Sequence, residues 1–210
     1  MSPDRDRARV TTRTGDGGDT SLFGKERVRK HDPRIEALGD LDEAQSALGV
    51  ARSQASGTVA AEILELQRGL YVAMSEVATP TSELARLSQR IDGLAVAAID
   101  EQAAALRATA RIEGRFVIPG EDPLSASLDV ARTIIRRAER RVVALVDAGA
   151  VDGTQLIPWL NRLSDIVFVL ARSVEPRSTT ALDQARTGFA RPSRRAPASR
   201  RSDSGDGRGV

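Results

Sequence analysis

The stretch SLDVARTIIRRAERRVVAL, residues 127–145, repeats its apolar residues with the period of an α-helix. These residues recur every three or four positions and form one stripe: Leu128, Ala131, Ile135, Ala138, Val142 and Leu145. Arg132, Arg136 and Glu139 fall at i, i+4 and i+7, so they share the opposite face. We predict a helix over residues 124–148, followed by Gly149 as a C-terminal glycine cap.

Four other segments have the same helical period. Asp32-Pro33 supplies an N-cap and a proline at the first position of a first helix. The other expected helices cover residues 59–77, residues 82 to about 111, and residues 155 or 159 to 173. No segment alternates with period two for long enough to predict a strand. Five helices with short links predict an all-α, up-and-down helix bundle. A mixed fold with FVIP, residues 116–119, as a strand is the less favoured alternative.

The composition narrows the class of protein further. The chain has 210 residues and only 3% aromatic residues, so its core must consist mainly of Ala, Leu, Val and Ile. It contains no cysteine, which excludes disulfides, thiolate metal sites and a Cys nucleophile. A single histidine, His31, argues against a His-based metal site. No apolar run approaches the roughly 18 residues that span a bilayer, and residues 1–10 lack an apolar signal core. We expect a cytoplasmic protein without a membrane partner.

We expect three regions along the chain: an arm at 1–31, the bundle at 32–175, and a tail at 176–210. Arg, Ser, Gly and Pro dominate the tail, which accounts for much of the basic excess behind the pI of about 9.6. Such a segment buries too little apolar area to fold alone, so we predict disorder. Nucleic-acid binding is the alternative, and the lack of stacking aromatic residues argues against it.

The arm contains TRTGDGGDTSLFGKERVRK, residues 12–30, which combines glycines, hydroxyls and basic side chains. It is not a Walker A loop, because Gly18 and Gly24 are separated by one residue too many and Lys25 precedes Glu26. Glycines nevertheless allow backbone N–H groups to converge on an anion, and the basic side chains would neutralise its charge. An anion site and a flexible polar arm both remain open.

Three polar features of the predicted helices also allow two interpretations each. Arg132 and Arg136 can belong to a solvated basic face, or they can share a bound anion that offsets their repulsion. The adjacent acids Asp42 and Glu43 can be surface acids or salt-bridge partners for an arginine of another helix or subunit. Asn161 and Asp165, at i and i+4, can face one site or bond to neighbouring helices.

Four segments, in order, resemble the PduO-type ATP:cob(I)alamin adenosyltransferases. The first is the arm sequence above, which looks like that family's TxTGDxGxTxLxxGxRVxK. GDLDEAQSALG, residues 39–49, looks like its GTVDELNSxxG. FVIPGEDPLSASLDVARTIIRRAERR and LNRLSDIVFVLAR look like its two later motifs, FILPGGTxxAxxLHxARTxxRRAER and LNRLSDxLFxLAR. The resemblance covers residues 12–172. It implies a five-helix bundle of the ferritin-like cobalamin adenosyltransferase type, assembled as a trimer with active sites between subunits.

The resemblance implies transfer of the 5′-deoxyadenosyl group of ATP to cob(I)alamin, giving adenosylcobalamin and triphosphate. It also implies roles for the matching residues. Arg132 and Arg136 would bind ATP phosphates or hold the site together, and Asp42 would pair with Arg132 across the subunit interface. Phe116 would press on the lower face of the corrin. The remaining matching residues would bind ATP and its Mg²⁺: Thr12, Thr14, Gly15, Asp16, Gly18, Lys30, Glu139 and Asn161. Further partners would be a cobalamin reductase or an adenosylcobalamin-dependent enzyme.

The chain departs from the family pattern at three positions. Asp129 stands where the motif has a histidine, Glu121 where it has a glycine, and Gln45 where it has an asparagine. Asp129 is at i−3 from Arg132, so we expect it to compete with ATP or Asp42 for that arginine. The alternative function is therefore a non-catalytic paralogue that keeps the trimeric bundle and ATP binding.

Overall fold

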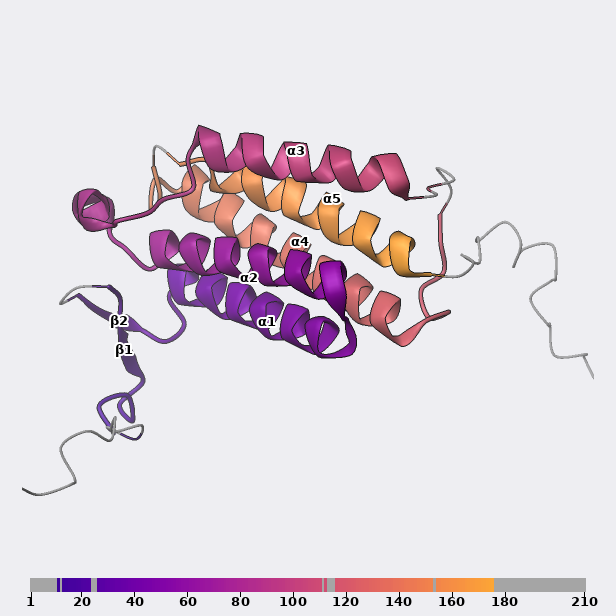
Figure 1. Ribbon diagram of the computed structural model, residues 1–210. Coiled ribbons are helices and arrows are strands. Elements are labelled where there is room, and N and C mark those ends of the chain that lie inside the picture. Colours follow the sequence, from indigo (N-terminus) through magenta and orange to yellow (C-terminus); the bar gives the residue numbers. More distant parts are fainter. Residues whose placement is uncertain are drawn as a thin grey trace, which may run out of the picture.

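The described part of the protein is a bundle of five α-helices with a short β-hairpin before the first (Figure 1). The structure, a computed structural model, describes residues 11, 13–23, 26–110, 112, 116–152 and 154–175. The helices are α1 (Pro33–Gln54), α2 (Gly57–Val77), α3 (Gly93–Thr109), α4 (Pro123–Asp147) and α5 (Leu156–Val174). The predicted five-helix fold is therefore confirmed, whereas the tail at 176–210 lies outside the described residues.

Successive helices run in opposite directions along the bundle, as Figure 1 shows. Helix α1 packs against α2 and α4, α4 packs against α5, and α3 packs on the outside of α5. The apolar stripe predicted for α4 lies in the core, which also takes aliphatic side chains from the other four helices.

The helix starts follow from local sequence. Asp32 accepts a hydrogen bond from the backbone N–H of Arg34 at 2.8 Å, and Pro33 is the first residue of α1. Asp122 and Pro123 begin α4 in the same way, with the backbone N–H of Ser125 donating to Asp122 at 3.0 Å. Because proline has the helical φ and lacks the N–H that would go unpaired, each Asp-Pro pair starts a helix cleanly.

The third helix departs from the prediction of one helix over residues 82–111. Residues Thr81–Arg86 form the 3₁₀ helix η1, and α3 begins only at Gly93. The cause is Glu76 of α2, a fully buried carboxylate that accepts hydrogen bonds from the backbone N–H of Ile91 and from Arg90, both at 2.9 Å. These bonds hold residues 87–92 outside a helix, and Asp92 then caps α3.

The hairpin pairs β1 (Asp19–Ser21) with β2 (Arg27–Arg29) in antiparallel register. Strands of three residues are too short for a period-two pattern, so the sequence did not predict them. The backbone N–H of Phe23 donates to the carbonyl of Ala78 at 2.9 Å, and the neighbouring Leu22 is buried. The hairpin is therefore attached to the end of the bundle where α2 ends.

Arg34 ties several elements together at that same end. Its Nη1 donates to the carbonyls of Val77 at 3.0 Å and Thr79 at 2.9 Å, and its Nη2 donates to the carbonyl of Ala150. One cation thus joins the start of α1, the end of α2 and the α4–α5 connection. It also satisfies carbonyls that a helix C-terminus leaves without partners.

Within the described part of the chain, no helix is both long and apolar enough to cross a bilayer.

The contact between α2 and α5 allows a first prediction. Trp159 of α5 is 4% exposed and packs on Gly69 of α2, where an added Cβ would lie 2.4 Å from its Cζ2 atom. We expect Gly69→Ala to lower the free energy of unfolding by about 1–3 kcal/mol, because the indole must move out of a packed core. Urea unfolding would measure the change.

Gly39→Ala in α1 is the matched control, because no heavy atom lies within 4 Å of the Cβ it would add. It should raise stability by up to about 1 kcal/mol through helix propensity. Equal losses in the two variants would contradict the proposed clash with Trp159.

Candidate active site

The charged face of α4 holds three of the predicted site residues, Arg132, Arg136 and Glu139, spaced along successive turns. Glu139 accepts a hydrogen bond at 3.2 Å from Nδ2 of Asn161 on α5, so these two predicted residues do meet. Asp165 instead faces Arg107 of α3 at 3.7 Å. Asn161 and Asp165 therefore contact different helices and do not share one site.

A hollow of about 450 Å³ opens beside Arg132. The segment between α3 and α4 supplies an apolar side, and α4 and α5 supply a charged side with one aromatic ring. Phe116, a predicted site residue, is 89% exposed at this hollow. The lining residues are Ile112, Phe116, Val117, Pro119, Asp129, Arg132, Phe168 and Arg172. Such a cavity suits a ligand that is partly apolar and partly anionic.

Asp129 joins two arginines beneath this hollow. Its Oδ1 accepts from Nε of Arg132 at 3.0 Å, and its Oδ2 accepts from Nη2 of Arg172 at 2.5 Å. The Asp129 and Arg172 side chains are only 5% and 2% exposed. The expected contact between Asp129 and Arg132 therefore exists, while competition with ATP or Asp42 stays a prediction.

Two more groups close the network around Arg172. Glu175 lies 3.0 Å from its Nη2, and the hydroxyl of Ser125 accepts from the same nitrogen at 3.0 Å. Both guanidinium groups lie over the ring of Phe168, with its centroid 5.9 Å from Cζ of Arg132 and 5.3 Å from Cζ of Arg172. Each buried charge thus has a partner, as a low-dielectric site requires.

The sequence did not single out Arg172, Phe168, Ser125 or Glu175. Arg172 and Phe168 occur in the quoted segment LNRLSDIVFVLAR. An arginine and an aromatic residue on so apolar a helix could have marked them as candidate site residues. The sequence around Ser125 and Glu175 does not predict their roles, because these roles depend on how α4 packs against α5.

The basic glycine-rich arm forms a second cluster. Gly18 has a φ of +85°, and Arg29 lies over it, 3.1 Å from where a Cβ would be. The Lys30 ammonium lies 3.2 Å from the Cβ position of Gly15. Side chains at these two glycines would displace the cations, which explains the glycines physically.

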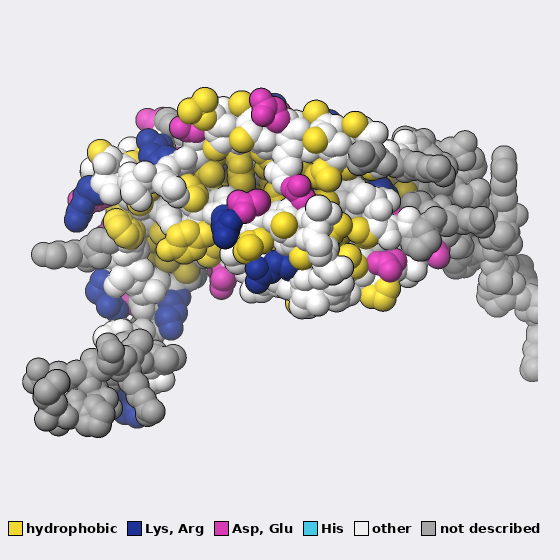
Figure 2. Space-filling view, viewed as in Figure 1, with side chains coloured by type: hydrophobic (Ala, Val, Ile, Leu, Met, Phe, Trp, Pro, Cys, Tyr) yellow, Lys and Arg dark blue, Asp and Glu magenta, His cyan; other side chains and the backbone are white. Residues whose placement is uncertain are grey.

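Arginines of β2 also bind carbonyls of this turn. Arg27 donates to the carbonyl of Thr14 at 2.9 Å, and Arg29 donates to that of Gly17 and to Asp19, both at 3.1 Å. The turn holds the predicted residues Thr14, Gly15, Asp16, Gly18 and Lys30 close together, whereas Thr12 lies outside the described residues. Lys and Arg side chains gather around the hairpin in Figure 2.

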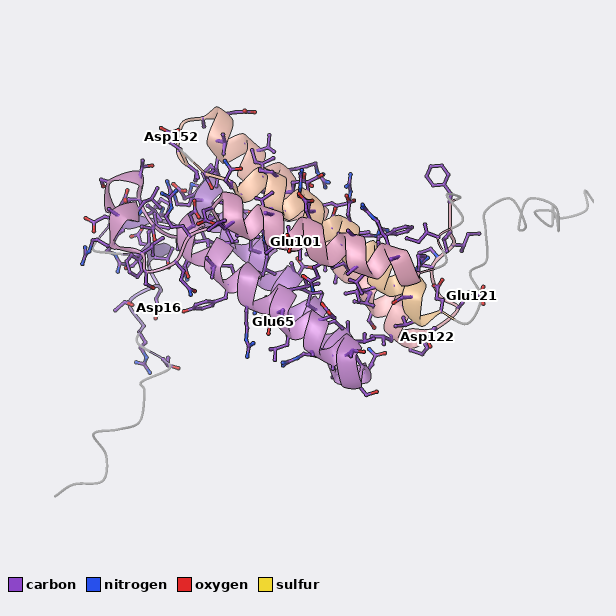
Figure 3. All side chains as sticks on the ribbon, turned by 45° about the horizontal axis from the view of Figure 1, so that its top comes forward. Asp16, Glu65, Glu101, Glu121, Asp122 and Asp152 are labelled. Atoms are coloured by element: carbon purple, nitrogen blue, oxygen red, sulfur yellow. The ribbon has the colours of Figure 1, made fainter. Side chains whose placement is uncertain are left out.

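A single chain does not bring the arm to the hollow. Figure 3 shows Asp16 of the arm at one end of the bundle and Glu121 and Asp122, next to the hollow, at the other. Asp42, the predicted partner of Arg132, is exposed on α1. The α1 acids that do contact α4 are Glu36, Asp40 and Glu43. A site containing the arm, Asp42 and Arg132 would therefore need more than one chain.

Arg137 lies on the side of α4 that faces α1. Its Nε donates to Asp40 at 3.0 Å, and its Nη2 pairs with Glu43. The hydrogen bond to Asp40 raises the pKa of Arg137 above its ordinary value, and the charges of Asp40 and Glu43 add to the effect. The interpretation of α1 acids as salt-bridge partners thus holds for Glu43.

A helix bundle with an arginine-lined hollow and a basic, glycine-rich arm is suited to an anionic ligand. Residues 10–174 match the family model described as cobalamin adenosyltransferase. A corrinoid adenosyltransferase of Mycobacterium tuberculosis is 39% identical over 173 residues, covering 80% of this chain and 89% of that protein. One from Citrobacter freundii is 39% identical over 168 residues, covering 80% and 95%. The chain belongs to the cobalamin adenosyltransferase family.

A solved structure agrees with this assignment. A variant of the PduO-type ATP:corrinoid adenosyltransferase from Lactobacillus reuteri, complexed with cobalamin and ATP, has a TM-score of 0.74 to this chain and 29% sequence identity. The match covers 82% of this chain and 98% of that one.

The buried network leads to a second prediction. Arg172→Met would leave the carboxylates of Asp129 and Glu175 together without their shared cation. We expect the free energy of unfolding to fall by about 3–5 kcal/mol, because the substitution removes the cation from two buried carboxylates. Chemical denaturation would measure it.

Arg107→Met is the control, since Arg107 and Asp165 form a pair that is about half exposed on both sides. That substitution should cost less than about 1 kcal/mol. A loss for Arg172→Met no larger than for Arg107→Met would contradict the importance of the network.

Proposed function

We propose that the protein is a corrinoid adenosyltransferase, which transfers the 5′-deoxyadenosyl group of ATP to cob(I)alamin and releases triphosphate. The observation that carries the proposal is the family match across residues 10–174, which includes the arm, the α4 face and the hollow. Relatives that are 39% identical over about four fifths of the chain are named corrinoid adenosyltransferases.

The chemistry suits a chain without cysteine. The electron pair of Co(I) attacks C5′ of ATP, the bond from C5′ to oxygen breaks, and the triphosphate leaves with the electrons of that bond. The cobalt is the nucleophile, so the protein has to align C5′ with the cobalt and stabilise negative charge on the leaving triphosphate. Arginines and a basic glycine-rich turn can do both.

The arm and the α4 face would bind the nucleotide. Thr12, Thr14, Gly15, Asp16, Gly18 and Lys30 would wrap the triphosphate. Arg136, which is exposed on α4, would bind phosphate oxygens in a bidentate manner, with two parallel N–H···O bonds. Glu139 and Asn161, already hydrogen-bonded to each other, would complete the nucleotide site.

Magnesium would enter with ATP as part of the substrate. No group of three or more metal-ligating side chains occurs among the residues that the structure describes. Magnesium is commonly held by one or two carboxylates together with substrate phosphates and water. The exposed Asp16, beside the proposed triphosphate site, fits that mode.

The hollow would receive the corrinoid. Phe116, a residue that is 89% exposed, would lie against the lower face of the corrin and exclude its axial base. Losing that ligand favours the Co(I) state that the reaction needs. A reductase that delivers this state, or an enzyme that uses adenosylcobalamin, would be a protein partner.

We further propose a homotrimer with sites between subunits. The arm and the hollow lie at opposite ends of the described bundle, and Asp42 is exposed on α1. A neighbouring copy would supply the missing half of each site, with Asp42 pairing to Arg132 of that neighbour.

The direct test of activity combines the protein with ATP, Mg²⁺ and chemically reduced cobalamin. We expect light-sensitive adenosylcobalamin to form, followed by its absorption spectrum, and chelation of Mg²⁺ should suppress the rate. ATP binding without product would instead favour the non-catalytic paralogue, which the engagement of Arg132 by Asp129 keeps as the second candidate.

Shared sites can be tested by mixing two inactive variants. Lys30→Ala impairs the arm and Arg136→Ala impairs the α4 face, so we expect each variant alone to lose most of its activity. We assume that the arm and the α4 face of each site come from different subunits and that the two variants are co-expressed in equal amounts. Half of the sites would then have an intact arm and half an intact face, so about one site in four would have both. Activity should recover to about a quarter of the wild-type rate.

A mixture no more active than the average of the two variants would contradict sites between subunits. The assembly itself should have a mass three times the 22.5 kDa of the chain by light scattering.

A further inference from the structure

Arg132 is held from two directions at the hollow. Its Nε donates to Asp129 at 3.0 Å, and its guanidinium lies over the ring of Phe168. Within the described ranges, these are the contacts that the structure gives to this side chain, which is 26% exposed. Its two terminal nitrogens therefore have no acceptor from the described part of the chain.

Asp129 cannot turn away without cost. Its other oxygen is 2.5 Å from Nη2 of Arg172, and both side chains are almost fully buried. Arg172 is further bonded to Ser125 and paired with Glu175. Among the described residues the network thus joins two arginines to two carboxylates, and all the polar contacts of Arg172 are made through Nη2 while its Nε has no hydrogen-bond partner.

This arrangement leaves Arg132 with one way to bind. A guanidinium can bind an oxyanion side-on, by donating from Nε and one terminal nitrogen, or end-on, by donating from both terminal nitrogens. Asp129 already occupies Nε. The end-on pair is the one that remains, at the edge of the hollow that Arg132 lines.

We propose that Asp129 is a positioning residue: it holds Nε of Arg132 so that the two terminal nitrogens bind one oxyanion end-on at the hollow. This proposal rests on the proposed function for the identity of the oxyanion. Two groups have the required chemistry, a phosphate of ATP and the Asp42 carboxylate of a second copy. Pre-ordering the arginine reduces the conformational entropy lost on binding either one.

Asp129→Asn is the central variant, because the amide keeps the size but cannot accept from both arginines. Calorimetry with Mg-ATP and no corrinoid measures nucleotide binding, and sedimentation measures self-association. If phosphate is the oxyanion, ATP binding should weaken about tenfold while assembly is unchanged. If Asp42 is the oxyanion, assembly should dissociate at about tenfold higher concentration, and Asp42→Asn should reproduce this without a further effect in the double variant.

An Arg132→Lys background separates positioning from stability. Lysine has no Nε–H to be held in this way, so Asp129→Asn should have no further effect on binding or assembly there. Glu76→Gln is the matched control: Glu76 is a buried carboxylate bonded to Arg90 and to the backbone of Ile91. It should lower the melting temperature and leave ATP binding and assembly unchanged.

If Asp129→Asn does not fold, Asp129→Glu can be used to test the same positioning role. It keeps a negative charge beside Arg172 but displaces the oxygen that meets Arg132, so the same loss is expected.

Two results would overturn the positioning role. One is a change of less than about twofold in both ATP binding and assembly. The other is an equal loss in the Arg132→Lys background. A wild-type protein that binds ATP but forms no adenosylcobalamin would overturn the proposed reaction and leave the positioning role standing. A wild-type protein that neither binds ATP nor self-associates would overturn both.

Discussion

The buried contact between Arg172 and Asp129 is the constraint on which the functional end of the bundle depends. Removing two such charges from water costs several kcal/mol per ion, and only close, complete pairing offsets this. The 2.5 Å contact, together with Glu175 and Ser125, supplies close pairing at Nη2 of Arg172, while its buried Nε has no hydrogen-bond partner among the described residues. Because these residues come from α4, from α5 and from the C-cap of α5, the network can form in only one axial register of the two helices.

That register determines the rest of the site. With α4 and α5 fixed at Asp129 and Arg172, Glu139 comes opposite Asn161 farther along the same pair of helices. The ring of Phe168 comes within cation–π distance of both guanidinium groups. Aliphatic side chains alone tolerate shifts and repacking, so the polar network gives the bundle a specificity that Leu, Ile, Val and Ala cannot. Arg34 does the same at the opposite end, where its three carbonyl partners place the hairpin end of the bundle.

Sequence predicted the parts of the molecule that depend on local period. The stripe and the charged face of α4 follow from 3.6-residue geometry, and the Asp32-Pro33 pair sets the start of α1. The error in the third helix has a non-local cause, because the buried Glu76 holds residues 87–92 from a different helix. The hairpin was missed because three-residue strands leave no period. The roles of Arg172 and Glu175 depend on which helices pack together, which no single segment specifies.

The arrangement of charge explains why arginine is suited to this site. A lysine at 132 could not be held at one nitrogen by Asp129 while presenting two others in a fixed plane. The ring of Phe168 and the carboxylate of Asp129 restrict the guanidinium from two directions. The conformational entropy of the Arg132 side chain is therefore lost when the protein folds and not when the ligand binds. The hollow thus presents a rigid donor to a ligand arriving from outside the chain. The other half of the proposed site is the glycine-rich arm, whose described residues contact the bundle through the buried Leu22 and the Phe23–Ala78 hydrogen bond, so the two halves of the site belong to separately anchored parts of the fold.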